Sequence, residues 1–172
     1  MRTFWRRPLS VAVAVFLAGC AGYSGHGLRP GQATEAEVTA AMGAPAMVWP
    51  LPDGRRQLAF PRGPAGVHTY MAWFGADGRL ESIRNVLAPE VFVEVLPGLG
   101  EAEVLRLLGP GEPAWTAHFP ARDELVLEWR YCDDWGETAR FDVLFDSTTK
   151  RVRSTDCRPE SSFTRYRTPC SR

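Results

Sequence analysis

The sequence has few of the residues on which enzymes usually build a reactive centre. It contains three histidines and four cysteines in 172 residues, and no cysteine pair has the two-residue spacing of a zinc or redox motif. The G-x-S-x-G, H-E-x-x-H and glycine-rich phosphate-binding patterns are missing. His26, His68 and His118 are scattered, so each is expected on the surface or partly packed. We therefore expect neither an enzyme nor a protein that holds a metal or a soluble cofactor.

The sequence also lacks an apolar run of the roughly 20 residues that span a bilayer. Its longest apolar run, residues 9–18, follows three arginines and ends at Leu17-Ala18-Gly19-Cys20. This order is typical of a secretion signal, here residues 1–19. The segment resembles the lipobox of bacterial lipoproteins, and the resemblance implies cleavage before Cys20 and covalent lipid on that residue. Because Ala21 stands where an aspartate would resemble an inner-membrane retention signal, we expect the outer membrane, with the chain facing the periplasm.

A large charge of either sign is missing as well. The chain has 20 basic and 20 acidic residues, and removal of residues 1–19 leaves a net charge of about −3. Nothing in this balance attracts nucleic acid, so the expected partners are envelope proteins and, through the lipid, the membrane. We expect a short tether at residues 20–27 and a flexible tail at residues 159–172, which is rich in Arg, Ser, Thr and Pro.

Lipid on Cys20 would leave three cysteines in an oxidising compartment, Cys132, Cys157 and Cys170. Cys132 and Cys157 flank an expected strand pair, so a Cys132–Cys157 disulfide is favoured. A Cys157–Cys170 disulfide is the alternative. The acids that follow Cys132, Asp133 and Asp134, are interpreted as a polar loop between strands.

The chain contains a diverged internal repeat. Residues 37–43 and residues 103–109 both read Glu-Val, four further residues, then Gly. In the first copy, Thr34 and Glu37 have the spacing of a helix-capping box, and in the second Gly100 and Glu103 take those places. The glycines at 43 and 109 are suited to end the helices. An additional helix is expected to begin at Pro89, and the first copy lacks its counterpart.

Alternating apolar residues after each helix predict antiparallel strands. The expected strands are residues 47–51, 57–60, 69–74 and 79–87 in the first copy, and 114–118, 125–131, 138–145 and 151–157 in the second. The predicted fold class is α+β, with two repeats, at residues 28–87 and 88–158. Each would pack one or two short helices on a three- to four-stranded antiparallel sheet.

The helix motif, Gly98 to Gly109 with Pro110 and Pro113, and more loosely Gly31 to Pro45, resembles the SmpA/OmlA family of BamE-like outer-membrane lipoprotein domains. The stretch from Phe60 to Gly66, continuing through Thr69-Tyr70-Met71, resembles proteobacterial lipoproteins with two such domains. The resemblance implies contacts with other envelope proteins. The tandem layout is also similar to the secreted beta-lactamase inhibitor protein, whose sheet surface binds its partner.

Four residues are candidates for a protein interface. The Pro- and Gly-rich loop at residues 61–66 presents Arg62 to a partner or uses it to brace the repeat. On the strand at residues 69–74, one face carries Tyr70 and the other carries Met71 and Trp73, so either an exposed interface or burial between the repeats is expected. We expect a scaffold in envelope maintenance or outer-membrane protein assembly. The alternatives are a binder of a small envelope ligand or peptidoglycan fragment, or an inhibitor-like module for a periplasmic enzyme.

Overall fold

The computed structural model describes residues 24–63, 66–162 and 169–170. The expected signal peptide and Cys20 lie outside these residues. The described chain is α+β, with short helices and two four-stranded antiparallel sheets. Of the described residues, none belongs to a helix long and apolar enough to cross a bilayer.

The first sheet, sheet 1, is a meander in which each strand pairs with the next along the chain. Helix α1, Glu35–Met42, precedes it. The strands are β1, Met47–Pro50; β2, Arg56–Pro61; β3, Thr69–Phe74; and β4, Leu80–Asn85. The predicted helix and the four predicted strands of this half agree with the observed elements to within two residues at each end.

Sheet 2 has the same order. Two helices precede it, α2, Pro89–Phe92, and α3, Glu101–Leu108. Its strands are β5, Ala117–Phe119; β6, Glu124–Cys132; β7, Thr138–Asp146; and β8, Val152–Pro159. The prediction of a strand at residues 114–118 is largely wrong. A 3-10 turn occupies Pro113–Trp115 instead, because Pro113 fixes the first position and the Glu112 carboxylate accepts from the Ala114 amide.

The helix starts of the two halves are held by matching contacts. The backbone amides of the N-cap residues, Thr34 and Gly100, each donate to the carboxylate three residues later. Each cap residue also forms an isolated bridge to the residue just before the last strand of its sheet, Arg79 before β4 and Arg151 before β8. Each of these arginines also donates 2.7 Å hydrogen bonds to the carbonyl two residues before the cap. These contacts connect the start of each helix to the edge of its own sheet that is formed by β4 or β8.

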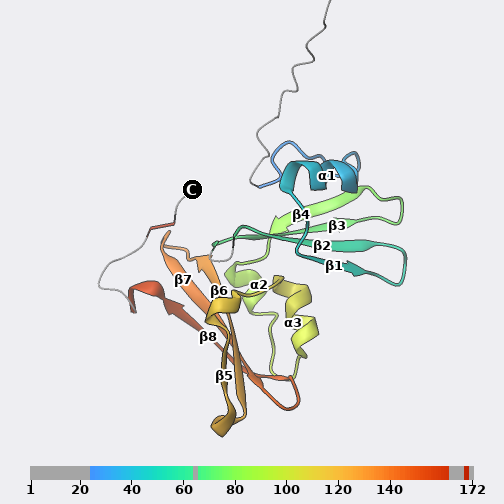
Figure 1. Ribbon diagram of the computed structural model, residues 1–172. Helices are drawn as coiled ribbons and strands as arrows, with labels where there is room; N and C mark the ends of the chain where they lie inside the picture. Colours follow the sequence, from blue (N-terminus) through green and yellow to red (C-terminus); the bar gives the residue numbers. More distant parts are fainter. Residues whose placement is uncertain (1–23, 64–65, 163–168, 171–172) are drawn as a thin grey trace, which may run out of the picture.

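The elements stack in four layers (Figure 1). Helix α1 covers one face of sheet 1, where Val38 and Met42 pack against apolar residues of β2 and β3. The opposite face of sheet 1 meets α2 and α3, and these helices cover one face of sheet 2. Ala59 and Met71 of sheet 1 belong to the same buried cluster as Val104 and Trp129. The two halves thus share one core, which we call the joint core.

Position in the stack explains the burial of each strand. Four consecutive residues of β2, from Gln57 to Phe60, are buried because both faces of sheet 1 are covered. In β6 and β7 the inward residues, such as Trp129 and Phe141, are buried, while many of the alternate ones carry charge. The face of sheet 2 turned away from α2 and α3, hereafter the outer face, is covered by no α-helix among the described residues, but the 3-10 turns Pro113–Trp115 and Glu160–Ser162 border it.

The sequence predicts a flexible tail from residue 159, but its described parts are bonded to sheet 2. Strand β8 runs to Pro159, and Glu160 is buried in the 3-10 turn Glu160–Ser162. Pro169 forms a bridge with Glu137, and the Cys170 amide donates to the Gly136 carbonyl at 2.9 Å. The prediction is therefore wrong for these residues.

Candidate functional site

Charged side chains on the outer face of sheet 2 are arranged in two rows across the strands. Strand register places Glu128 of β6 opposite Asp142 of β7, and Asp142 opposite Asp156 of β8; we call these three the acidic row. Two residues along, the same register aligns Arg130, Arg140 and Arg158, the arginine row. Like charges directly opposite each other are unfavourable in a sheet, so the rows must stabilise one another.

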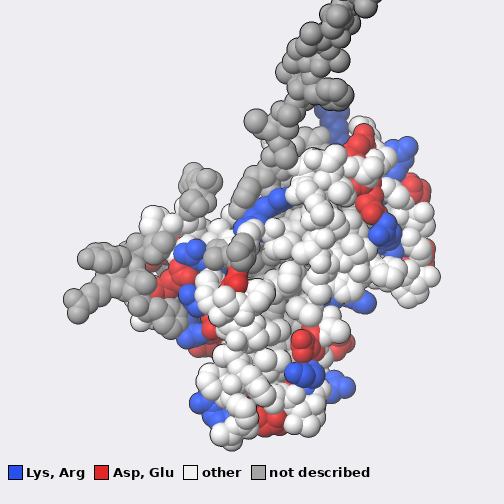
Figure 2. Space-filling model, viewed as in Figure 1, with Lys and Arg blue, Asp and Glu red and all other residues white. Residues whose placement is uncertain are grey.

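Ion pairs connect the two rows diagonally. Arg140 Nη1 lies 2.9 Å from Glu128 Oε2. Arg158 reaches all three acids: its Nε pairs closely with Asp142 Oδ2, and it lies 3.7 Å from Glu128 and 3.9 Å from Asp156. Figure 2 shows the result as blue and red atoms side by side at the edge of the molecule where β7 and β8 run in Figure 1.

Glu160 lies beside the arginine row, on the side away from the acidic row. Its carboxylate lies 2.6 Å from Arg130 Nη2 and 3.3 Å from Arg140 Nε, and it accepts a 2.9 Å hydrogen bond from the Thr138 hydroxyl. Burial by itself would raise the pKa of Glu160, but the bonds from Arg130 and Thr138 outweigh it and the pKa is lowered. The group is therefore a fixed anion at neutral pH.

Asp142 is the buried member of the acidic row, with 2% of the residue exposed. Its Oδ2 pairs with Arg158, whereas its Oδ1 is enclosed without a hydrogen-bond partner among the described residues. Burial raises the pKa of Asp142, the Arg158 hydrogen bond opposes the rise, and repulsion from Glu128 adds to it. A buried acceptor without a donor is unusual in a native fold and requires an explanation.

A groove runs along the outer face beside the acidic row. Its volume is about 370 Å³. Val126 and Leu144 line its floor, Phe119 and Arg122 lie at one side, and the acidic row lies at the other. Arg122 is stacked over the Phe119 ring at 4.3 Å, and at the arginine row Arg140 is stacked over Trp115 at 3.9 Å. The outer face therefore combines an apolar strip with charged and aromatic borders.

The composition of the outer face is suited to binding. No three His, Cys, Asp or Glu side chains in the described part of the chain are grouped closely enough to hold a metal ion. An apolar floor with a polar, charged border is the usual composition of a protein interface.

The four predicted interface residues are not brought together on one surface. Met71 is fully buried in the joint core, so its prediction as an interface residue is wrong and burial between the two halves is the correct alternative. Trp73 is half-buried, packs against the joint core and lies under the Arg84 guanidinium at 5.3 Å. Tyr70 packs on the opposite side of sheet 1, against the cluster under α1.

Arg62 braces the first half. Its Nη1 donates a 3.0 Å hydrogen bond to the Met42 carbonyl at the end of α1, and its guanidinium lies 5.6 Å from the Tyr70 ring. The last carbonyls of a helix have no partner within the helix, so this arginine satisfies one of them. The bracing role is the one the structure supports.

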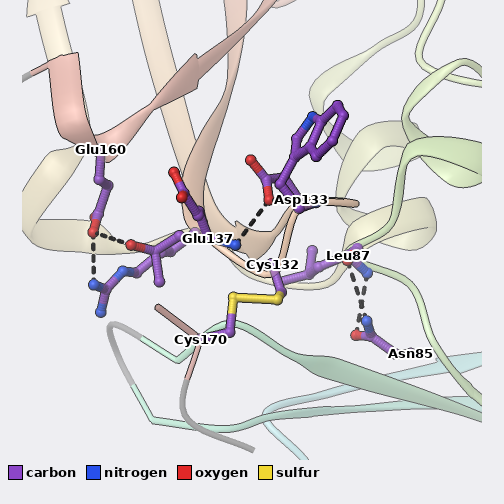
Figure 3. Close-up of a disulfide and its surroundings, with 10 residues drawn as sticks. Asn85, Leu87, Cys132, Asp133, Glu137, Glu160 and Cys170 are labelled. Carbon is purple, nitrogen blue, oxygen red and sulfur yellow. Dashed lines mark hydrogen bonds and ion pairs between the residues drawn. A yellow bond between two sulfur atoms is a disulfide. The ribbon is translucent and has the colours of Figure 1, made fainter. Parts of the chain in front are cut away.

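The disulfide joins Cys132 to Cys170 (Figure 3), and Cys157 is free and exposed. Both predicted pairings, Cys132–Cys157 and Cys157–Cys170, are therefore wrong. Strand β7 lies between β6 and β8, and Cys132 points to the outer face while Cys157 is in register with the inward Phe141. Cysteines two strands apart on opposite faces exceed the Cα separation of about 7 Å that a disulfide can bridge.

The outer face was not predicted from the sequence, although the sequence contains a signal for it. In β6 and β7 every inward position is apolar, and the outward positions include Glu128, Arg130, Arg140 and Asp142. Such alternation marks one face as solvent-facing, and its density of paired opposite charges distinguishes it from an ordinary polar face.

Comparison with protein-family models, with curated proteins and with solved structures finds no match to this chain.

Proposed function

We propose that the protein is a lipid-anchored lipoprotein of the periplasmic face of the outer membrane that acts by binding another envelope protein. The observation that carries this proposal is the outer face of sheet 2. It is a strand surface with an apolar groove and paired charges, and no α-helix among the described residues covers it.

The anchoring part of the proposal rests on the lipobox-like segment ending at Cys20. One acyl chain holds a protein to a membrane only weakly, whereas several chains hold it durably. Lipid attached through Cys20 would keep the binding face close to the membrane, where its partner is expected.

The family part of the proposal is a tandem of two BamE-like repeats. It is supported by the helix followed by a four-stranded meander in each half, by the matched caps at Thr34 and Gly100, and by the matched arginine contacts of Arg79 and Arg151. A role in envelope maintenance or outer-membrane protein assembly follows from the family resemblance. An inhibitor-like module is a special case of the same mode of binding, in which the partner is an enzyme.

A small-ligand function is less well supported. The hollow between the loops of the two halves, about 340 Å³, is lined by Pro61, Gly63, Pro110, Gly111 and Pro113. These side chains neither donate nor accept hydrogen bonds, whereas ligand pockets usually contain a few polar groups that fix the ligand.

Photo-crosslinking in cells tests the proposal. A crosslinking amino acid at Ser154 or Asp156, both exposed on the outer face, is expected to give a discrete protein adduct. The same amino acid at Glu81, exposed on sheet 1, is the matched control and is expected to give none. Cys20→Ser should move the protein from the membrane to the soluble fraction. Adducts of equal yield at Ser154 and Glu81, or a membrane-bound C20S protein, would contradict the corresponding part of the proposal.

A further inference from the structure

We infer that the acidic row and its groove accept an arginine or lysine side chain from the protein partner. The inference rests on the proposed function, because it specifies which part of the partner the outer face recognises. Three observations support it: the charge of the groove, the unmet acceptor on Asp142, and the way in which Arg158 already occupies the acidic row.

The groove has more acids than bases. Its lining includes four carboxylates and two guanidinium groups: Glu124, Glu128, Asp142, Asp156, Arg122 and Arg158. Of the arginines in the lining, Arg122 pairs with Glu124 at 2.9 Å. Arg140, next to the groove, pairs with Glu128 at 2.9 Å, and Arg158 is the base nearest to Asp142 and Asp156. The groove is therefore complementary to an added positive charge.

Asp142 supplies a position for that charge. It lies in the middle of the acidic row, and its enclosed Oδ1 lacks a donor among the described residues. An arginine offers several N–H donors in a fixed planar fork, and such donors match carboxylates well. A neutral donor would satisfy the hydrogen bond but would add no positive charge to the acidic row.

Arg158 shows how a guanidinium fits the acidic row. Its side chain, which is 35% exposed, comes from the edge strand β8 and contacts Asp142, Glu128 and Asp156. A half-buried side chain on an edge strand can rotate out without breaking the strand pairing. A partner's cation then takes the place of Arg158, and the apolar floor at Val126 and Leu144 accepts the neighbouring apolar side chains of the partner.

The occupant is an organic cation on a protein and not a metal ion. The carboxylates in the described part of the chain do not lie close enough together for metal coordination. Spaced carboxylates next to an apolar strip instead suit a long side chain with an apolar stem and a charged end.

The test measures binding of a labelled acetyl-Leu-Arg-Leu amide peptide to the full lipidated chain in detergent, by fluorescence anisotropy, with amide chemical shifts to locate it. The matched probe replaces the arginine by citrulline, which has nearly the same shape without charge. We expect the arginine peptide to bind at least about tenfold more tightly and to weaken with added salt. Shifts should centre on Val126, Asp142, Leu144 and Asp156.

Variants distinguish peptide binding at the acidic row from nonspecific binding elsewhere on the protein. Asp142→Asn and the exposed Asp156→Asn should each weaken arginine-peptide binding several-fold, whereas the remote Glu81→Gln should leave it unchanged. Arg158→Gln should strengthen binding several-fold, because the internal competitor is removed. Equal affinity for the two peptides, or no effect of either aspartate variant, would overturn the inference.

The result is distinguishable from the outcome of the crosslinking experiment. A protein adduct at Ser154 together with equal binding of both peptides would keep the proposed function and reject the cation site. Selective binding of the arginine peptide without any protein adduct would keep the cation site and reject the proposed function.

Discussion

Gln57 and Arg106 connect the two halves of the molecule: the Gln57 side-chain amide in β2 donates a 2.6 Å hydrogen bond to the Arg106 carbonyl in α3. The carbonyl lies in the last turn of its helix, where backbone acceptors lack helical partners. We expect Gln57→Ala to lower the free energy of unfolding by about 1 to 3 kcal/mol, because the part-buried hydrogen bond and the packing of the buried Gln57 side chain are lost. Urea unfolding measures the change. Gln32→Ala, at an exposed position, is the control, and equal midpoints for the two variants would contradict the assignment.

Substitution of Gly109 tests the packing of α3 against sheet 1. It has φ of +74°, and a Cβ there would lie 2.8 Å from Thr69 Cγ2. Gly43, its counterpart after α1, has φ of +89° but no atom within 4 Å of such a Cβ. Both alanine variants incur backbone strain of about 1 to 2 kcal/mol, and Gly109→Ala adds an overpacking cost of about 1 to 3 kcal/mol.

Thermal or urea unfolding of Gly109→Ala and Gly43→Ala should therefore show the larger loss at Gly109. Thr69→Ser, which removes the clashing methyl group, should recover part of the difference when combined with Gly109→Ala. Equal losses at the two glycines would show that the overlap with Thr69 is relieved without cost.

The disulfide is expected to stabilise the fold because it closes a loop and so restricts the unfolded chain. Cys132 and Cys170 are 38 residues apart, and a loop of that length corresponds to about 4 kcal/mol in the chain-entropy description. Cys170→Ser, or reduction, should lower stability by about that amount, whereas Cys157→Ser should change it little because Cys157 is free and exposed. Unfolding with and without reductant provides the measurement, and insensitivity of the wild-type protein to reductant would refute the expectation.

Glu160 and Asp142 should affect the pH dependence of stability with opposite sign. The pKa of Glu160 is lowered from 4.5, so its contribution is complete above that pH and is lost as the pH falls through the folded-state pKa. Glu160→Gln is expected to cost about 3 kcal/mol at neutral pH, because Arg130 and Arg140 lose their carboxylate. The gap between wild type and E160Q should narrow below pH 4.5. A constant gap would mean that the carboxylate charge is not what holds the two arginines.

The pKa of Asp142 is raised from 3.8, so the folded state favours the protonated carboxyl. Wild-type stability should therefore fall relative to Asp142→Asn as the pH rises from 3.8 through the raised folded-state pKa. Chemical unfolding at a series of pH values checks this, with the exposed Asp134→Asn as control. A wild-type protein that gains stability over D142N in that interval would show that the Arg158 ion pair outweighs burial.

Local chemistry explains why the helices and most strands could be predicted from sequence. The capping box at Thr34, the Glu103 carboxylate that accepts from the Gly100 amide, and the glycines at 43 and 109 define α1 and α3 within a few residues. Apolar alternation defines β6 and β7. These signals act over one or two turns of chain and do not depend on the rest of the fold.

Properties that depend on the packing of one half against the other could not be predicted. Whether Met71 is exposed is decided by where α2 and α3 lie, and the cysteine pairing is decided by strand order and side-chain direction together. Glu160 reaches the arginine row only after β8 has paired with β7. The outer face is an intermediate case, because its alternating charges are visible in the sequence but their rows depend on strand register.

The position of α2 and α3 between the sheets makes each half an incomplete folding unit. If the chain were cut after residue 87, Ala59 and Met71 would be left in water on an uncovered sheet, since the helices that bury them belong to the other fragment. An amino-terminal fragment would then aggregate or recruit the missing layer from another molecule, as in domain swapping. The two fragments, produced separately, should restore the native fold when mixed.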